Sequence, residues 1–262
     1  MKNKFTYLFV CFVLILSAFY SSSLSAQENQ MPAKDRIQQS NDKLPVTTSS
    51  PEARQEYTQA LNYLENSQID KARSLFQEAI KADQNFALAY MGAALTAASF
   101  NESKEYFDKA ENLVGQASEG EKHLVAMTKA QFEANAGKGK TEAQQLDNMY
   151  PNNKQVQFMI GQFYFFMDNE RDQAIAHLQK AVSIDDKYAP AYNLLGYAYS
   201  DKNDFTKAEN AFKKYISLIP DNPNPYDSYA ELLLKNGRYD ESIQQYEKAL
   251  SIDPQFYSSL EG

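Results

Sequence analysis

The 262-residue sequence has one cysteine, two histidines and no tryptophan. Its cysteine, Cys11, lies in an apolar N-terminal run, so the rest of the chain cannot form a disulfide and must be stabilised by packing. His123 and His177 have no cysteine or second histidine nearby, whereas a zinc site needs three or four converging ligands. These shortages predict a chain with no metal site and no cofactor.

Basic residues are scarce beside acidic ones, with 26 Lys and Arg against 34 Asp and Glu and a net charge of −8. Such a chain lacks the basic stripe that neutralises phosphates, so we expect no nucleic-acid partner. The carboxylates are spread over helical segments, and no serine or cysteine stands in a recognisable nucleophile motif. The sequence therefore predicts no enzyme activity.

One stretch, ANAGKGKT at residues 134–141, satisfies a relaxed phosphate-loop pattern. A phosphate loop follows a buried β-strand, whereas the residues before this stretch have helical periodicity. We interpret Gly137 as the end of one helix that opens at Ser118 and continues to about Ala136, with a short partner helix from Thr141 to Met149. Nucleotide binding is not expected here.

The N-terminus has the layout of an export signal. Lys2 and Lys4 precede an apolar run over residues 5–20, which is shorter than the roughly 20 residues that span a bilayer. We predict a signal peptide at 1–26, cleaved after Ala26, and a periplasmic or secreted protein; an uncleaved anchor is the alternative. No later segment is apolar and long enough for stable membrane insertion after cleavage.

Residues 27–49 are polar and contain two prolines, which predicts a flexible leader. The leader ends where a serine cap, Pro51 and Glu52 mark the start of a helix.

A repeat with a period near 34 residues fills the remainder. AYNLLGYAYS at 191–200 aligns without a gap on PYDSYAELLL at 225–234, and each copy has two helical segments separated by a polar turn. The matched positions are Tyr192 with Tyr226, Gly196 with Ala230, Phe212 with Tyr246 and Pro220 with Pro254. The small residue at Gly196 predicts close approach of the two helices of a copy.

This pattern resembles the tetratricopeptide repeat, which has an aromatic, Leu-Gly and Tyr in its first helix and Ala, an aromatic and Pro in its second. The matching residues are Tyr192, Leu195, Gly196, Tyr199, Ala208, Phe212 and Pro220. The resemblance implies an all-α, right-handed α-solenoid over residues 50–262 with about six helix-turn-helix pairs, the second and third degenerate. The expected repeats lie near 53–86, 87–119, 120–153, 154–188, 189–222 and 223–256.

In the resembled family, ligands contact fixed positions of each first helix on the inner surface of the solenoid. Those positions hold, in chain order, Tyr57, Leu61, Met91, Leu95, Leu124, Thr128, Phe158, Gln162, Asn193, Tyr197, Asp227 and Glu231, and we add Phe165. The surface runs from apolar to acidic along the chain. Only Asn193 fits the clamp that grips acidic chaperone tails, so that activity is not carried over.

The resemblance therefore implies a non-catalytic scaffold or assembly factor that binds a peptide or protein segment in this groove. The alternatives are a non-catalytic binder of a glycan or small ligand that stacks on groove aromatics, and aromatics that serve only packing between repeats. The chain stops eight residues after Pro254, where Phe256, Tyr257 and Leu260 are expected to form a covering turn. Otherwise the last helix is a candidate homodimer face.

Overall fold

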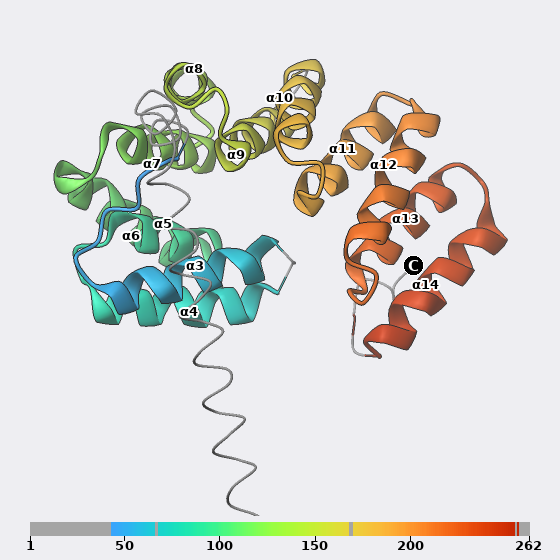
Figure 1. The fold of residues 1–262 in the computed structure, drawn as a ribbon, viewed down its shortest axis with the longest axis horizontal. Coiled ribbons are helices and arrows are strands. Elements are labelled where there is room, and N and C mark those ends of the chain that lie inside the picture. The colour runs from blue at the N-terminus through green and yellow to red at the C-terminus, as the bar shows by residue number, and fades with distance from the viewer. Residues whose placement is uncertain (1–42, 66–67, 168–169, 255, 257–262) are drawn as a thin grey trace, which may run out of the picture. The chain divides into compact units, whose positions relative to one another are not determined.

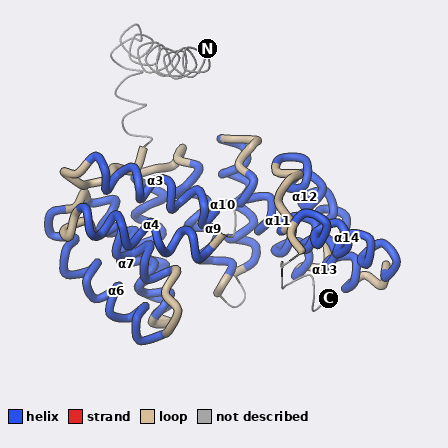
Figure 2. The backbone as a smooth tube through the Cα atoms, turned by 90° about the horizontal axis from the view of Figure 1, so that it is seen from below, coloured by secondary structure: helices blue, strands red, loops and turns tan. Residues whose placement is uncertain are grey.

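The computed structural model describes residues 43–65, 68–167, 170–254 and 256. Within these ranges the regular structure consists of twelve α-helices and one 3-10 helix, with no strand (Figures 1 and 2), which confirms the all-α expectation. The predicted signal peptide, residues 27–42 of the predicted leader, and Tyr257 and Leu260 lie outside the described residues.

The helices form six consecutive pairs, as the repeat predicts. Their bounds are α3 Pro51–Glu65, α4 Ile69–Ala82, α5 Ala87–Leu95, α6 Phe100–Leu113, η1 Val114–Gln116, α7 Glu119–Phe132, α8 Ala136–Met149, α9 Lys154–Phe165, α10 Arg171–Ile184, α11 Ala189–Asp201, α12 Phe205–Leu218, α13 Asn224–Lys235 and α14 Tyr239–Ile252. The two helices of each pair pack side by side (Figure 1), and the first helices α3, α5, α7, α9, α11 and α13 also contact one another in order.

Serine caps begin two of the helices where the sequence indicates them. The Ser50 hydroxyl accepts a hydrogen bond from the Ala53 N–H at 3.1 Å, with Pro51 in the first turn of α3. Ser118 and Glu121 form the reciprocal capping box that opens α7. These side chains satisfy amides that have no partner inside the helix.

The small residue of the repeat allows close packing within a pair. A Cβ on Gly196 would lie 2.5 Å from Cε1 of Phe212 on α12, and one on Gly161 would lie 2.8 Å from Cγ of Leu178 on α10. Both distances are too short for real carbon contacts, so glycine permits the large side chain of the second helix to reach the first. This confirms the packing role expected of Gly196.

The third pair departs from the sequence interpretation. Helix α7 ends at Phe132 and α8 begins at Ala136, so Gly137 lies inside the first turn of α8 rather than at the end of α7. The break falls earlier because Ala134 takes a left-handed φ of 56° and the Asn135 side chain accepts from the Lys138 N–H. The glycine-lysine stretch is thus helical and follows a helix, not a strand.

The buried apolar side chains form three separate clusters that follow one another along the chain. One continuous cluster runs from Ala53 on α3 to Phe163 on α9. Smaller clusters follow, one around Leu178 and Leu195 and another around Phe212 and Leu233. The first three pairs and α9 therefore share one apolar core, whereas α10 and the last two pairs are joined by smaller ones.

Candidate functional site

An apolar cavity of about 360 Å³ opens among the first helices of five consecutive pairs. Helices α3, α5, α7, α9 and α11 supply most of its lining, and we call it the first-helix cavity. Its size falls within the range of about 300–1,000 Å³ that is usual for ligand sites in proteins. First helices line it because each pair presents that helix to its neighbours on the same side.

Seven of the predicted groove residues meet in this cavity: Tyr57, Leu61, Leu95, Leu124, Phe158, Gln162 and Asn193. The remaining lining residues are Leu44, Val46, Leu64, Ile69, Leu88, Gln155, Met159, Tyr188, Pro190 and Leu194. The fold thus brings together residues from α3 to α11 that are far apart in sequence and that the family resemblance assigned to one surface. Their role in binding stays a prediction.

Some predicted groove positions are enclosed rather than exposed. Met91 is 1% exposed, and Tyr57 is 4% exposed, with its ring centroid 5.0 Å from that of Phe86. Leu124 and Thr128 on α7 are also buried. Met91 lies in the core because α5 is apolar on nearly every side and is surrounded by its neighbours.

The cavity lining is neutral. None of its residues is Asp, Glu, Lys, Arg or His, and its polar groups are three amides from Gln155, Gln162 and Asn193, with two tyrosine hydroxyls. The Asn193 Oδ1 atom is buried and has no hydrogen-bond partner in the described part of the chain. A buried acceptor without a donor costs about 1–3 kcal/mol, so this atom lowers the stability of the fifth pair.

An aromatic pair forms one side of the cavity. The rings of Phe158 and Tyr188 meet edge to face with centroids 5.5 Å apart, and Lys154 Nζ lies 5.1 Å from the Tyr188 ring centroid. Lys154 also contacts Asp185 at 2.5 Å, and this hydrogen bond is the main reason that the pKa of Asp185 is below its ordinary value. These contacts fix the rings, which favours a preformed apolar surface.

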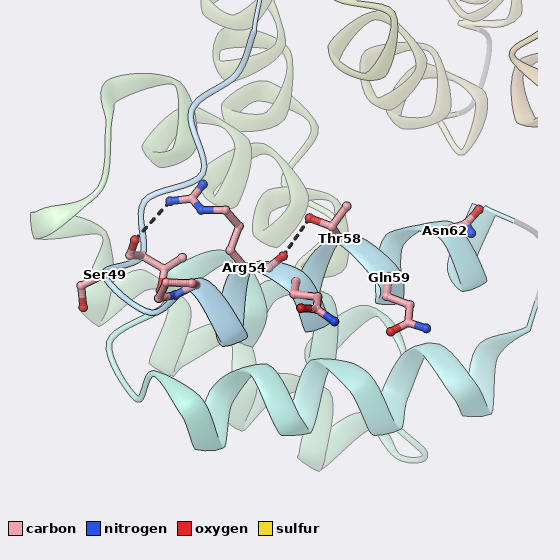
Figure 3. Close-up of a pocket in the computed structure, with 8 residues that line it drawn as sticks. Ser49, Arg54, Thr58, Gln59 and Asn62 are labelled. Atoms are coloured by element: carbon pink, nitrogen blue, oxygen red, sulfur yellow. Dashed lines mark hydrogen bonds between the residues drawn. The ribbon is translucent and has the colours of Figure 1, made fainter. Parts of the chain in front are cut away.

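A second side of the cavity was not anticipated from the sequence. Residues 44–48, which we call the strap, lie within the predicted leader, yet Leu44 and Val46 line the cavity and pack against the large core cluster. Figure 3 shows Arg54 of α3 directed back toward this segment, where its Nη2 donates to the Thr48 carbonyl at 3.1 Å. Alternate apolar residues at 44 and 46 were the only signal in the sequence.

The predicted residues of the last pairs form a different surface. The Tyr197 hydroxyl donates to Glu231 Oε2 at 2.8 Å, while Asp227 is 4% exposed. Burial raises the pKa of Tyr197, and desolvation followed by the nearby Asp227 raises the pKa of Glu231. This acidic surface is separate from the residues that line the first-helix cavity.

Phe165, which we added to the groove, does not line the cavity. Its ring centroid lies 4.3 Å from the Arg171 guanidinium carbon, and Arg171 also donates to the Phe165 carbonyl. These contacts place Phe165 at the turn between α9 and α10.

The described residues contain no group of three or more His, Cys, Asp or Glu side chains placed to hold a metal ion. Nor do they contain a helix with both the length and the hydropathy needed to span a membrane.

Consecutive helix pairs whose first helices line a shared cavity define the chain as an α-solenoid repeat protein. Family models described as the tetratricopeptide repeat match residues 57–117, 189–222 and 223–256. The chain is therefore a tetratricopeptide-repeat protein. This fold generally serves non-catalytic protein interaction.

Curated relatives match only part of the chain. It is 30% identical over 99 residues to Superkiller complex protein 3 of Mus musculus, covering 38% of this chain and 6% of the relative. It is 27% identical over 90 residues to Anaphase-promoting complex subunit 3 of Schizosaccharomyces pombe, covering 34% and 14%. The match thus spans a small fraction of the length of these relatives.

Solved structures show the same fold at low identity. The crystal structure of the APC/C hetero-tetramer Cut9-Hcn1 matches with a TM-score of 0.52 at 19% identity, covering 80% of this chain and 42% of that one. PilW, a type IV pilus biogenesis factor, matches with a TM-score of 0.51 at 14% identity, covering 81% and 99%. Thermus thermophilus TTC0263, a TPR protein, gives 0.50 at 19%, covering 80% and 95%.

Proposed function

We propose that the chain is a non-catalytic scaffold outside the cytoplasm that holds an apolar segment of a partner protein in the first-helix cavity. The observation that carries this proposal is a neutral, largely apolar cavity that the first helices of five pairs line together. Location outside the cytoplasm rests on the charged, apolar and small-polar order of the N-terminal 26 residues.

The lining specifies the chemistry of the occupant. Charged side chains would lose hydration without gaining an ionic partner, so uncharged apolar side chains are favoured. A peptide backbone offers N–H donors and C=O acceptors beside those side chains, which suits the amide side chains of Gln155, Gln162 and Asn193. A glycan presents many hydroxyls, and three amides with two tyrosine hydroxyls are few partners for them.

An assembly role is consistent with the relatives. Two of them are described as a complex protein and a complex subunit, and one matched structure is a hetero-tetramer. Tetratricopeptide repeats serve such roles with unrelated partners, so the partner of this chain must be inferred from its own cavity.

The test selects peptides that bind the parent protein from a random library. It then compares the affinity of these peptides for the parent protein and for two variants that each lack one phenylalanine. Phe158→Ala removes the cavity ring, whereas Phe166→Ala removes a phenylalanine at the end of the same helix that is 63% exposed and does not line the cavity. We expect Phe158→Ala to weaken binding about tenfold or more and Phe166→Ala less than about twofold. Equal binding by a Phe158→Ala variant that keeps its helical circular dichroism would refute the cavity as the site.

A second variant tests the unpaired acceptor. Asn193→Leu replaces an amide whose Oδ1 is buried without a donor by an apolar group of similar size, so the free protein should gain up to about 1 kcal/mol of stability. The same change removes one of the three amides that line the cavity and should weaken peptide binding about fivefold or more. Thermal unfolding and isothermal titration measure the two effects, and a variant that binds the selected peptides as tightly as the parent would contradict the role of Asn193.

A further inference from the structure

The strap lies against the repeats as an extended peptide. Its side chains alternate: Leu44, Val46 and Thr48 are half-buried, whereas Pro45 and Thr47 are exposed. Burial of every second residue is the pattern of an extended chain that presents one face to a surface. Leu44 and Val46 on the buried face contribute to both the core cluster and the first-helix cavity.

A buried carboxylate holds the strap in place. Glu121 in the first turn of α7 is 1% exposed, and its two oxygens accept from the Thr47 N–H at 2.7 Å and the Thr47 hydroxyl at 2.5 Å. Its Oε2 also accepts from the Ser118 N–H at 2.8 Å. Glu121 therefore joins the strap to the capping box of α7.

Two contacts from the first pair complete the attachment. The Thr48 hydroxyl donates to Asp83 Oδ2 at 2.5 Å, at the end of α4, and Arg54 donates to the Thr48 carbonyl (Figure 3). Thr47 and Thr48 are thus tied to α7, α4 and α3, three residues before α3 begins. Withdrawing the strap would break charge-assisted hydrogen bonds to both carboxylates.

The repeats also leave room for the strap. A Cβ on Gly120, next to Glu121, would lie 2.8 Å from Leu44 Cδ1 and 2.4 Å from the Tyr150 hydroxyl oxygen. Glycine at this point lets α7 approach Leu44 closely. The cavity of about 360 Å³ is the space that is open with the strap attached.

We propose that the strap is a fixed wall of the binding site and that the partner segment contacts Leu44 and Val46 directly. This inference rests on the proposed function and extends it, because it adds two specificity-determining residues from outside the repeats. Glu121 acts as a positioning residue through Thr47. The partner segment is the uncharged, apolar peptide that the neutral lining favours.

The first experiment measures the affinity of library peptides selected on the parent protein. Leu44→Ala combined with Val46→Ala removes the apolar face of the strap, and Ser49→Ala changes an exposed side chain just beyond it. We expect the double variant to bind about tenfold more weakly and Ser49→Ala to bind within about twofold of the parent. Unchanged affinity would overturn the inference, and tighter binding would do so by showing that the strap competes with the peptide.

The second experiment needs no peptide. In a Cys11→Ser background, iodoacetamide should modify Val46→Cys about tenfold more slowly than Ser49→Cys, because the side chain at 46 faces the repeats. Adding Thr47→Val removes the hydroxyl contact with Glu121 and should accelerate modification at position 46. Equal rates at the two positions in the parent background would show that the strap is not attached.

The outcomes separate the two proposals. A selected peptide that depends on Phe158 but not on Leu44 and Val46 leaves the proposed function standing and removes the strap from the site. If no selected peptide depends on Phe158, the proposed function is refuted. The strap then has no role in peptide binding, even if slow modification of Val46→Cys by iodoacetamide shows that the strap is attached to the repeats.

Discussion

The helices from α3 to α9 and those from α10 to α14 are built on one repeat but use different side chains between neighbouring pairs. Helices α3 to α9 share a continuous apolar cluster, and the adjoining first-helix cavity is neutral. Helices α11 to α14 have small clusters, and polar contacts connect them, such as Lys235 Nζ donating to the Ser200 carbonyl at 3.1 Å. The α3 to α9 region therefore offers an apolar surface to a ligand. The later helices present the carboxylate of Glu231, which accepts a hydrogen bond from the Tyr197 hydroxyl.

The difference teaches that agreement with the repeat pattern and the presence of a site are separate properties. Tyr192, Gly196 and Phe212 match the repeat pattern best, yet none of these three residues lines the cavity. The pattern describes packing inside a pair, whereas the cavity depends on the other face of the first helices. Family membership alone therefore does not locate the site.

The largest expected effect tests whether the two regions unfold separately. Phe212→Ala deletes a fully buried ring in the last core cluster and should cost about 3–5 kcal/mol of unfolding free energy. Because each repeat contacts only its neighbours, amides of α11 to α14 should exchange faster while those of α3 to α7 keep their protection. Phe76→Ala, in the large cluster, should reverse the pattern. Equal loss of protection in both regions after Phe212→Ala would mean that the solenoid unfolds as one unit.

A smaller effect is expected at the close contact inside the fifth pair. Gly196→Leu places a side chain where a Cβ alone would lie 2.5 Å from Phe212, and overpacking should cost about 1–3 kcal/mol. Gly137→Ala in α8 is the matched control, because nothing lies within 4 Å of its Cβ position and alanine favours a helix by up to about 1 kcal/mol. Urea unfolding measures both, and a Gly196→Leu variant as stable as the parent would refute the packing role of Gly196.

Much of this architecture follows from the 34-residue period, because the pairing of the helices and their close packing at Gly196 depend on residues within a single repeat. The site was only partly predictable. The family position that falls on Met91 predicts a groove residue, but Met91 is buried because the residues of α5 are apolar on nearly all sides and its neighbours enclose it. The strap was missed because its attachment depends on Glu121, which is 74 residues away from Thr47.

Acid should weaken the last pairs through Glu209 of α12. Burial raises the pKa of Glu209, but hydrogen bonds from Lys213, Tyr229 and Arg238 outweigh it and lower the pKa from 4.5 to about 2. A lowered carboxyl pKa means that the stabilisation is complete above the unfolded value of 4.5 and is lost as the pH falls toward 2.

The measurement for this prediction is thermal unfolding between pH 6 and pH 3, with hydrogen exchange to locate the change. Tyr229 and Arg238 belong to the last pair, so α13 and α14 should loosen before α3 and α4. Glu209→Gln should make the stability of these helices less dependent on pH. If the variant and the parent lose stability identically over this range, Glu209 is not the group responsible.

The smallest effect concerns ion pairs between the turns of successive repeats. Lys202 Nζ contacts Asp172 at 2.5 Å, and Arg171 Nε contacts Asp201 at 2.8 Å, so each pair of charges joins α10 to the end of α11. Asp172 is 83% exposed, and exposed pairs contribute about 0–1 kcal/mol because water and salt screen them. Lys202→Ala should therefore lower stability by less than about 1 kcal/mol in dilute buffer and by almost nothing in 1 M salt. A loss of more than about 1 kcal/mol in dilute buffer that disappears in 1 M salt would show that charge, and not only packing, holds the later repeats together, and the contrast with the apolar first region would then be sharper than the cores alone suggest. A loss that persists in 1 M salt would instead mean that the Lys202 side chain contributes through packing.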